Sequence, residues 1–135
     1  MKITYNSVKQ KLLMLDTNKT YGHDKSHPMV LKSFVAQFAV PLALIFEKSL
    51  ETGKVPSSWL KANVTPIFKK GSRLQPSNYR PVSLTSIPCK IMESIVRDHI
   101  MKHLIDNNLL RKNQHGFVPR KACVTNLLET YDFIT

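Results

Sequence analysis

Two prolines inside strand-like runs constrain the fold of this chain more than any other feature. Residues 64–69 and 79–85 have the composition of two strands, separated by a turn-rich loop. Proline has no backbone N–H, so Pro66 and Pro81 cannot donate to the hydrogen-bond ladder of a central sheet. The pattern therefore predicts an exposed edge hairpin.

The sequence predicts two helices before this hairpin. A short one is expected to end near Asp16. A longer one begins at Pro28, whose missing N–H costs nothing at a helix start, and runs to about Glu51. Pro41 lies inside it and is expected to kink or divide it. The apolar run at residues 34–46 is too short to span a bilayer, which needs about 20 residues, so a buried helix is expected there.

A further helix is predicted after the hairpin, with Thr85 or Ser86 as its cap and Pro88 in its first turn. Its apolar positions recur at helical spacing, at Ile91, Met92, Ile95, Val96, Ile100 and Leu104. A last helical pattern comprises Val124, Leu127, Leu128, Tyr131 and Ile134. It continues almost to the final residue, which indicates a piece of a longer protein. The predicted fold class is α+β, mostly helical, with one basic hairpin.

Positive and negative charges are segregated along the chain. The net charge is +11, and residues 52–92 and 107–128 contain no acidic side chain. Just over half of the 20 basic residues lie in these two segments. A surface of this kind favours nucleic acid, acidic lipid or an acidic protein as the partner.

The hairpin carries the first candidate site. Lys69 and Lys70 end the first predicted strand, and Arg80 begins the second. Antiparallel pairing brings such strand ends together. Lysine supplies a point charge and arginine can bond two oxygens at once, which suits a triphosphate. Spacing alone nevertheless favours a solvated basic turn, because charge runs usually form solvated faces.

The second candidate site is the run Gln114-His115-Gly116-Phe117. Gly116 permits a close approach of the backbone to a ligand. Phe117 can stack on a base or sugar, or fill the core, which is the commoner role of a lone phenylalanine. Arg120 and Lys121 lie near the start of the last predicted helix, where a helix N-terminus attracts phosphate.

Little in the sequence indicates metal or nucleophilic chemistry. His99 and His103 are four residues apart, but neither the glutamate of a zinc-binding HExxH helix nor a third ligand accompanies them, so no metal site is predicted. Cys89 and Cys123 are expected to be reduced core residues of an intracellular protein. The N-terminal residues lack a secretory hydrophobic segment.

Four motifs together resemble a known family. They are VPSSW at residues 55–59, PIFKKG at 66–71, NYRPVSL at 78–84 and QHGF at 114–117. In this order and spacing they resemble the N-terminal part of reverse transcriptases from non-LTR retrotransposons of the jockey and chicken-repeat type. The resemblance extends from about Val8 to Thr135.

The resemblance implies a domain organisation and a set of contacts. Residues 1–53 would lead into the fingers of a right-hand polymerase, and residues 54–135 would form an incomplete fingers portion that stops before the palm. The implied nucleotide contacts are Lys69, Lys70, Arg80, Gln114, Gly116 and Phe117. The implied template contacts are Arg73, Arg120 and Lys121.

The resemblance also implies what the chain lacks. Val118 stands where the family often has arginine, and Lys121 and Ala122 replace arginine and serine. The catalytic aspartates would lie beyond Thr135, so the Mg²⁺ of the complete enzyme would have its ligands outside this chain. The partners of that enzyme would be an RNA template, a DNA primer and a dNTP, with no membrane. The alternatives are a non-catalytic RNA-binding module and an inert relic of a mobile element.

Overall fold

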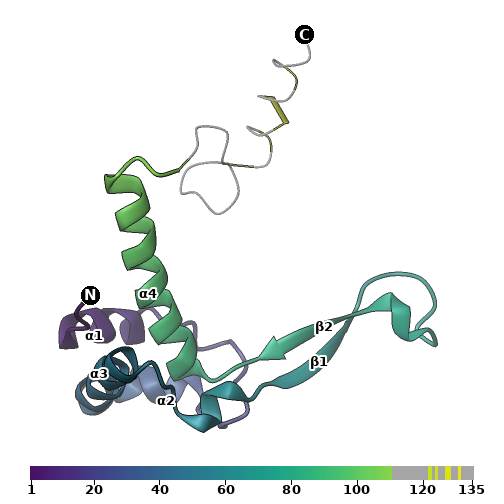
Figure 1. Ribbon diagram of the computed structural model, residues 1–135. Coiled ribbons are helices and arrows are strands. Elements are labelled where there is room, and N and C mark those ends of the chain that lie inside the picture. The colour runs from purple at the N-terminus through teal and green to yellow at the C-terminus, as the bar shows by residue number, and fades with distance from the viewer. Residues whose placement is uncertain (111–121, 123, 125–126, 129–130, 132–135) are drawn as a thin grey trace. The chain divides into compact units, whose positions relative to one another are not determined.

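The computed structural model describes residues 1–110, together with Ala122, Val124, Leu127, Leu128 and Tyr131. The chain forms two compact units, Met1–Arg97 and Asp98–Thr135. The elements in chain order are α1 (Tyr5–Leu13), α2 (Pro28–Ser33), α3 (Val35–Thr52), the 3₁₀ helix η1 (Ser57–Leu60), β1 (Asn63–Phe68), the 3₁₀ helix η2 (Pro76–Asn78), β2 (Tyr79–Leu84) and α4 (Ile87–Asp106) (Figure 1). This mixture of helices with one antiparallel strand pair agrees with the predicted α+β class.

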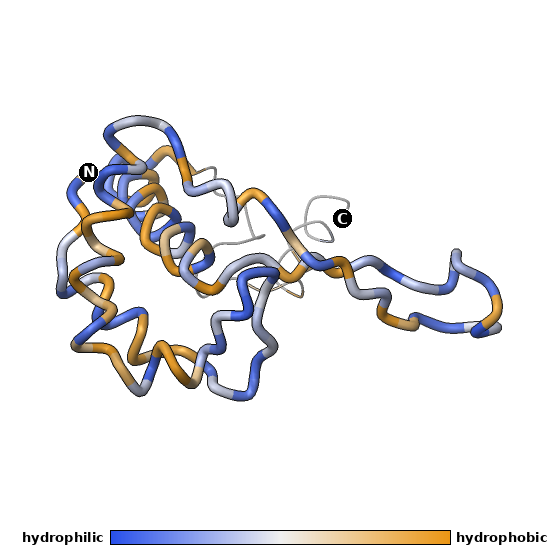
Figure 2. The backbone as a smooth tube through the Cα atoms, turned by 90° about the horizontal axis from the view of Figure 1, so that it is seen from below, coloured by the Kyte–Doolittle hydropathy of each residue, from blue (hydrophilic) through white to orange (hydrophobic). Residues whose placement is uncertain are grey.

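The core of the first unit is helical. Val8 and Leu12 of α1 are fully buried, as is Phe46 of α3. Trp59 of η1 packs edge-on against Phe46, with 5.6 Å between the ring centroids. The N-terminal half of α4 adds Ile87, Ile91, Met92 and Ile95 to the same cluster. In Figure 2 the helices carry most of the hydrophobic residues, whereas the hairpin loop is mostly hydrophilic.

The predicted helix from Pro28 is divided, but the prediction that Pro41 could divide it was wrong. The break lies at Phe34, which ends α2 and precedes α3, whereas Pro41 lies within α3. A proline removes the hydrogen bond to the carbonyl four residues earlier, here that of Gln37. Both Gln37 and Pro41 are exposed, so water can solvate that carbonyl and the helix continues.

The expectation of a buried helix at residues 34–46 was also wrong. One face of α3 is buried, but Phe34 and Val40 are each 51% exposed and Leu44 is 63% exposed. The described part of the first unit offers no element to cover this second apolar face, so α3 is a surface helix. Among the described helices, none combines the length and hydropathy that crossing a bilayer requires.

The start of α4 distinguishes between the two predicted caps. Ser86 is fully buried, and its Oγ accepts a hydrogen bond from the Cys89 N–H at 3.5 Å. Pro88 lies in the first turn, as predicted. Only the N-terminal half of the predicted apolar stripe of α4 is buried. Ile100, which belongs to the second unit, is 53% exposed.

The second unit contains the end of α4. Asn108 has φ +54 and follows the helix, and the Leu109 N–H bonds to the carbonyl of Leu104 at 2.9 Å. Asparagine tolerates this left-handed conformation, which is common where helices end. The four described residues of the last predicted helix, Val124, Leu127, Leu128 and Tyr131, are helical and exposed, and Ile134 lies outside the described residues.

The register of the hairpin explains how it accommodates two prolines. Pro66 stands directly opposite Pro81. The Lys69 N–H donates to the Asn78 carbonyl at 2.8 Å, so these two residues form a hydrogen-bonded pair. Bonded and non-bonded pairs alternate along an antiparallel ladder, so the proline pair is non-bonded and both ring nitrogens face the outer edges. No ladder bond is lost, and the sheet in the described residues is the predicted edge hairpin.

The proline pair removes one outward donor from each edge of the hairpin, which opposes pairing with a further strand. The double variant Pro66→Thr/Pro81→Thr restores both donors. We expect it to self-associate at concentrations where the parent chain does not, as measured by static light scattering. Ser83→Thr is the control, because it adds a β-branched residue but no new donor. A double variant as well dispersed as the parent would contradict this role of the prolines.

A close backbone contact connects the N-terminal loop to the end of the hairpin. Gly22 is buried, and a Cβ built on it would lie 2.3 Å from the carbonyl oxygen of Thr85. Thr85 follows β2 and precedes α4. The loop before α2 therefore packs directly on the segment through which the hairpin joins α4.

We expect Gly22→Ala to lower the free energy of unfolding by about 3 kcal/mol, the upper end of the usual cost of overpacking, because the new methyl group meets backbone that cannot move aside easily. Gly53→Ala is the control. Gly53 has φ +65 but no atom within 4 Å of a built Cβ, so only the strain of the left-handed conformation applies, about 1 kcal/mol. Urea unfolding followed by Trp59 fluorescence measures both, and equal losses would contradict the contact.

Candidate functional site

The register places two predicted site residues on one face of the hairpin. Ile67 pairs with Arg80, and Lys69 pairs with Asn78 through the bond described above. Directly opposed residues project to the same face, and every second residue along a strand shares that face. Lys69 and Arg80 are therefore diagonal neighbours on one face, roughly 7–8 Å apart in such ladders and within reach of one ligand. We call this the cationic face.

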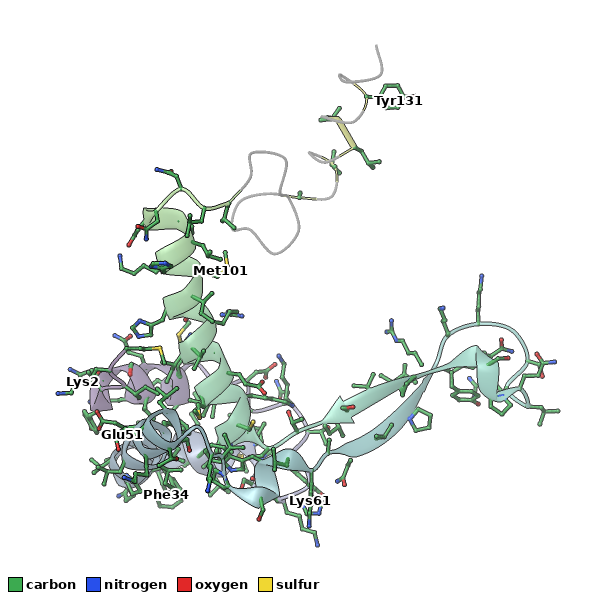
Figure 3. All side chains as sticks on the ribbon, viewed as in Figure 1. Lys2, Phe34, Glu51, Lys61, Met101 and Tyr131 are labelled. Carbon is green, nitrogen blue, oxygen red and sulfur yellow. The ribbon has the colours of Figure 1, made fainter. Side chains whose placement is uncertain are left out.

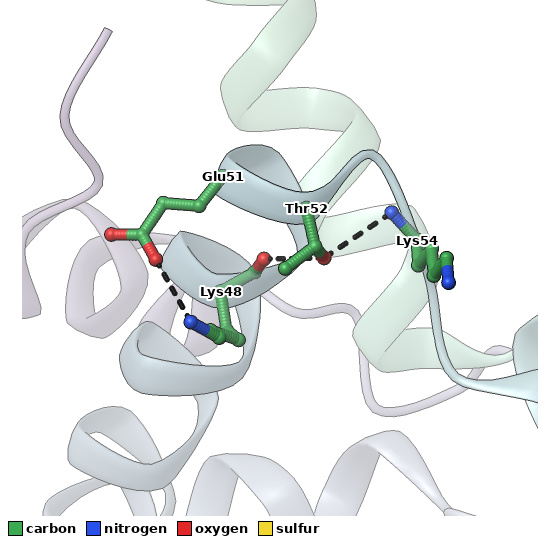
Figure 4. A network of polar contacts seen from close by, with 4 residues as sticks. All are labelled: Lys48, Glu51, Thr52 and Lys54. Atoms are coloured by element: carbon green, nitrogen blue, oxygen red, sulfur yellow. Dashed lines mark hydrogen bonds and ion pairs between the residues drawn. The ribbon is translucent and has the colours of Figure 1, made fainter.

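The charge of the cationic face is not neutralised locally. Within the described residues, no carboxylate forms an ion pair with Lys69, Lys70 or Arg80, and all three are exposed. Glu51 is the last acidic residue before the acid-free segment 52–92. It lies within α3, and its Oε2 is 3.3 Å from Lys48 Nζ (Figure 4). The nearest preceding acid along the chain is thus already paired within its own helix.

The opposite face of the hairpin is aromatic. The rings of Phe68 and Tyr79 meet edge-on, with 5.5 Å between their centroids. The guanidinium carbon of Arg73 lies 5.1 Å from the Phe68 ring centroid, and the Tyr79 hydroxyl donates to the Arg73 carbonyl at 3.0 Å. We call this the aromatic face. The side chains of the hairpin project from both sides of the ribbon (Figure 3).

A shallow pocket of about 370 Å³ lies at the tip of the hairpin. Its lining residues are Pro66, Arg73, Leu74, Pro76 and Tyr79. Ring and aliphatic carbon predominate in this set, and one guanidinium supplies positive charge. Such a surface can hold a flat ring by stacking while the cation meets a phosphate.

The structure describes four of the nine predicted site residues and places two of them on one face; the binding roles of all nine stay predictions. Lys69 and Arg80 share the cationic face, Lys70 follows in the loop, and Arg73 lies on the aromatic face. The remaining predicted contacts, Gln114, Gly116, Phe117, Arg120 and Lys121, lie outside the described residues. They stay predictions.

The sequence interpretation missed Asn78 and Tyr79 as residues that organise the loop. Asn78 Nδ2 donates to the Ser72 carbonyl at 2.7 Å, and Tyr79 bonds to Arg73 as described. A signal was present, because asparagine commonly bonds to nearby backbone in turns. The partner across the loop could not be identified before the register was known.

The described residues contain no group of three or more histidine, cysteine or acidic side chains placed to hold a metal ion. His103 Nδ1 lies 3.1 Å from Asn107 Nδ2 on an exposed part of the second unit. A catalytic metal centre of the polymerase kind needs clustered carboxylates, and the described side chains do not form such a cluster.

Cys89 is a weak nucleophile. Burial, followed by the charge and hydrogen bond of Glu93, raises the pKa of the Cys89 thiol to about 11. The Sγ lies 3.5 Å from Glu93 Oε1, to which it donates. Thiolate is the reactive form, so at neutral pH this side chain is almost entirely unreactive.

We predict that, in a Cys123→Ser background, the rate of Cys89 alkylation by iodoacetamide rises with pH towards a midpoint near the pKa of about 11. Glu93→Gln should lower that midpoint, because it removes a negative charge that disfavours the thiolate, but desolvation should keep it above the usual value of about 8.5. A midpoint already near 8.5 in the parent would contradict the raised pKa.

Comparison with known proteins identifies similar sequences. The chain is 29% identical over 116 residues to an RNA-directed DNA polymerase from the mobile element jockey of Drosophila melanogaster, and 27% identical over 116 residues to a probable RNA-directed DNA polymerase from transposon BS of that species. A jockey polymerase of Drosophila funebris is 28% identical over the same length. No protein-family model matches the chain.

Each of these three matches covers 85% of the chain but only 13% of the relative's length. They confirm the resemblance to reverse transcriptases of jockey-type mobile elements. The chain thus matches only a small part of the length of each relative.

Proposed function

We propose that this chain is part of an RNA-directed DNA polymerase of a non-LTR retrotransposon, and that its hairpin belongs to the fingers of a right-hand polymerase. The cationic face would bind the phosphates of the incoming nucleotide. The observation that carries this proposal is the shared face of Lys69 and Arg80, in a segment without a single acidic residue.

The two cations would act differently on a polyphosphate. The Arg80 guanidinium can donate two parallel hydrogen bonds to oxygens of one phosphate or of adjacent phosphates. The Lys69 ammonium is a compact charge that can follow the negative charge along the chain of phosphates. Lys70, the next residue after Lys69, adds attraction at longer range. Neutralising a triphosphate in this way holds it without performing chemistry on it.

The aromatic face would contact the template strand. Arg73 is exposed and lies over the Phe68 ring, so its N–H groups can meet a phosphate while Tyr79 and the prolines of the pocket contact a base or sugar. Stacking of this kind contributes about 1–3 kcal/mol per base and tolerates any sequence. Gln114, Gly116, Phe117, Arg120 and Lys121 would complete the nucleotide and template contacts.

The chain alone would not be catalytic. Polymerases of this type need metal ions held by clustered carboxylates, and the described side chains do not provide such a cluster. As the resemblance implies, Mg²⁺ in the complete enzyme would be bound by residues outside this chain. That enzyme would act on an RNA template, a DNA primer and dNTPs.

Salt dependence tests the role of the cationic face. We expect the chain to bind inorganic triphosphate and single-stranded RNA, more weakly as salt increases. For RNA, Lys69→Ala and Arg80→Ala should each reduce the slope of log affinity against log salt by about one. Lys2→Ala, which removes one positive charge before α1, is the control and should leave the slope unchanged.

Three results would contradict the proposal. If Arg80→Ala and Lys2→Ala changed the affinity for triphosphate equally, the hairpin would have no special role. An RNA salt slope unchanged by both hairpin substitutions would favour the RNA-binding module. DNA synthesis by the purified chain with primer, RNA template, dNTPs and Mg²⁺ would show that it contains its own catalytic centre.

A further inference from the structure

The loop that joins the two strands is held together by hydrogen bonds of one residue, Asn78. Between residues 61 and 81, every residue is exposed except Asn78 and Tyr79, which are half-buried. The hairpin has no hydrophobic core beneath it, and an isolated two-stranded hairpin is at best marginally stable in water. Polar contacts within the loop, together with the Phe68–Tyr79 ring contact, must therefore hold the strand ends together.

Asn78 makes hydrogen bonds to three separate parts of the loop. Its carbonyl accepts from the Lys69 N–H at 2.8 Å, and its own N–H donates to the Gln75 carbonyl at 3.0 Å. Its side-chain Nδ2 donates to the Ser72 carbonyl at 2.7 Å. The last of these bonds crosses the loop, and it depends on the asparagine amide.

The Asn78 side chain lies directly against the backbone of Gly71. Its φ is +88, a conformation that side-chain-bearing residues rarely adopt. A Cβ built on Gly71 would lie 2.7 Å from Asn78 Nδ2 and 3.1 Å from Asn78 Cγ. The amide of Asn78 therefore packs directly against the Gly71 backbone, where only glycine leaves enough room.

We infer that Asn78 is a positioning residue for the cationic face. Lys69 pairs with Asn78, and Arg80 lies two residues beyond it, so the closed loop fixes the separation of the two cations. Without the bond to Ser72, the loop end of the hairpin opens more readily and the ligand must order it on binding. This inference rests on the proposed role of Lys69 and Arg80 and adds the residue that arranges them.

The test distinguishes the arrangement of Lys69 and Arg80 from the number of positive charges on the hairpin. Asn78→Ala removes the cross-loop bond without changing the number of cations. We expect triphosphate and RNA to bind about tenfold more weakly, because ordering mobile side chains has a free-energy cost of that size. The salt slope for RNA should stay at the parent value, because the same cations still contact the phosphates.

A second variant disturbs the contact between Asn78 and Gly71 by changing Gly71. Gly71→Ala leaves every polar group in place but conflicts with Asn78 and with its own φ, so it should weaken binding without altering the salt slope. Gln75→Ala is the matched control in the same loop, since only the backbone of Gln75 takes part in the closure, and it should bind as the parent does. Amide exchange at Ile67 and Arg80 reports whether the strands remain paired.

The outcomes are distinct. Parent-like affinity in Asn78→Ala would overturn the inference. So would a salt slope reduced by about two, with protection lost at Ile67 and Arg80, because the asparagine would then be needed for the hairpin as a whole. If Arg80→Ala itself had no effect on the slope, the proposed function would fail, whatever the result at Asn78.

Discussion

The hydrogen bond from the Lys69 N–H to the Asn78 carbonyl determines the register on which the rest of the hairpin depends. It makes the pair Pro66–Pro81 non-bonded, so neither proline breaks the ladder. The same register assigns Lys69 and Arg80 to one face and Phe68 and Tyr79 to the other. One backbone contact thus reconciles the prolines with a strand pair and separates charge from aromatic surface.

The helical part of the first unit performs a different task. Phe46 and Trp59 anchor the end of α3 and the segment that leads into β1, and Gly22 lets the N-terminal loop pack against the backbone just after β2. The chain is therefore held before and after the hairpin. The hairpin itself has no core, and it is maintained by polar contacts in its loop, the ladder between its strands and the ring contact of Phe68 with Tyr79.

Much of this architecture follows from sequence patterns. The strand bounds agree with prediction to within one residue, because turn residues and prolines mark them strongly. Pro41 misled the prediction of the helix break, since its effect depends on whether the carbonyl it leaves unbonded can reach water. The exposure of Leu44 was equally unpredictable, because helical periodicity does not reveal how many neighbours cover a face.

The candidate site was predictable in composition but not in arrangement. Lys69 and Arg80 could be selected from charge and strand position, whereas their shared face required the register. The bond from Asn78 to Ser72 and the place of Arg73 over Phe68 depend on the path of the loop. Such contacts join residues whose spacing carries no periodic signal.

The alternation of side chains across the ribbon limits how the sequence can change. Adding or deleting one codon within either strand would transfer the residues beyond it to the other side. Lysine or arginine would then stand among the rings, and a ring would stand among the cations. Point substitutions can therefore accumulate along these strands, but changes in length can be tolerated only in pairs or outside the ladder.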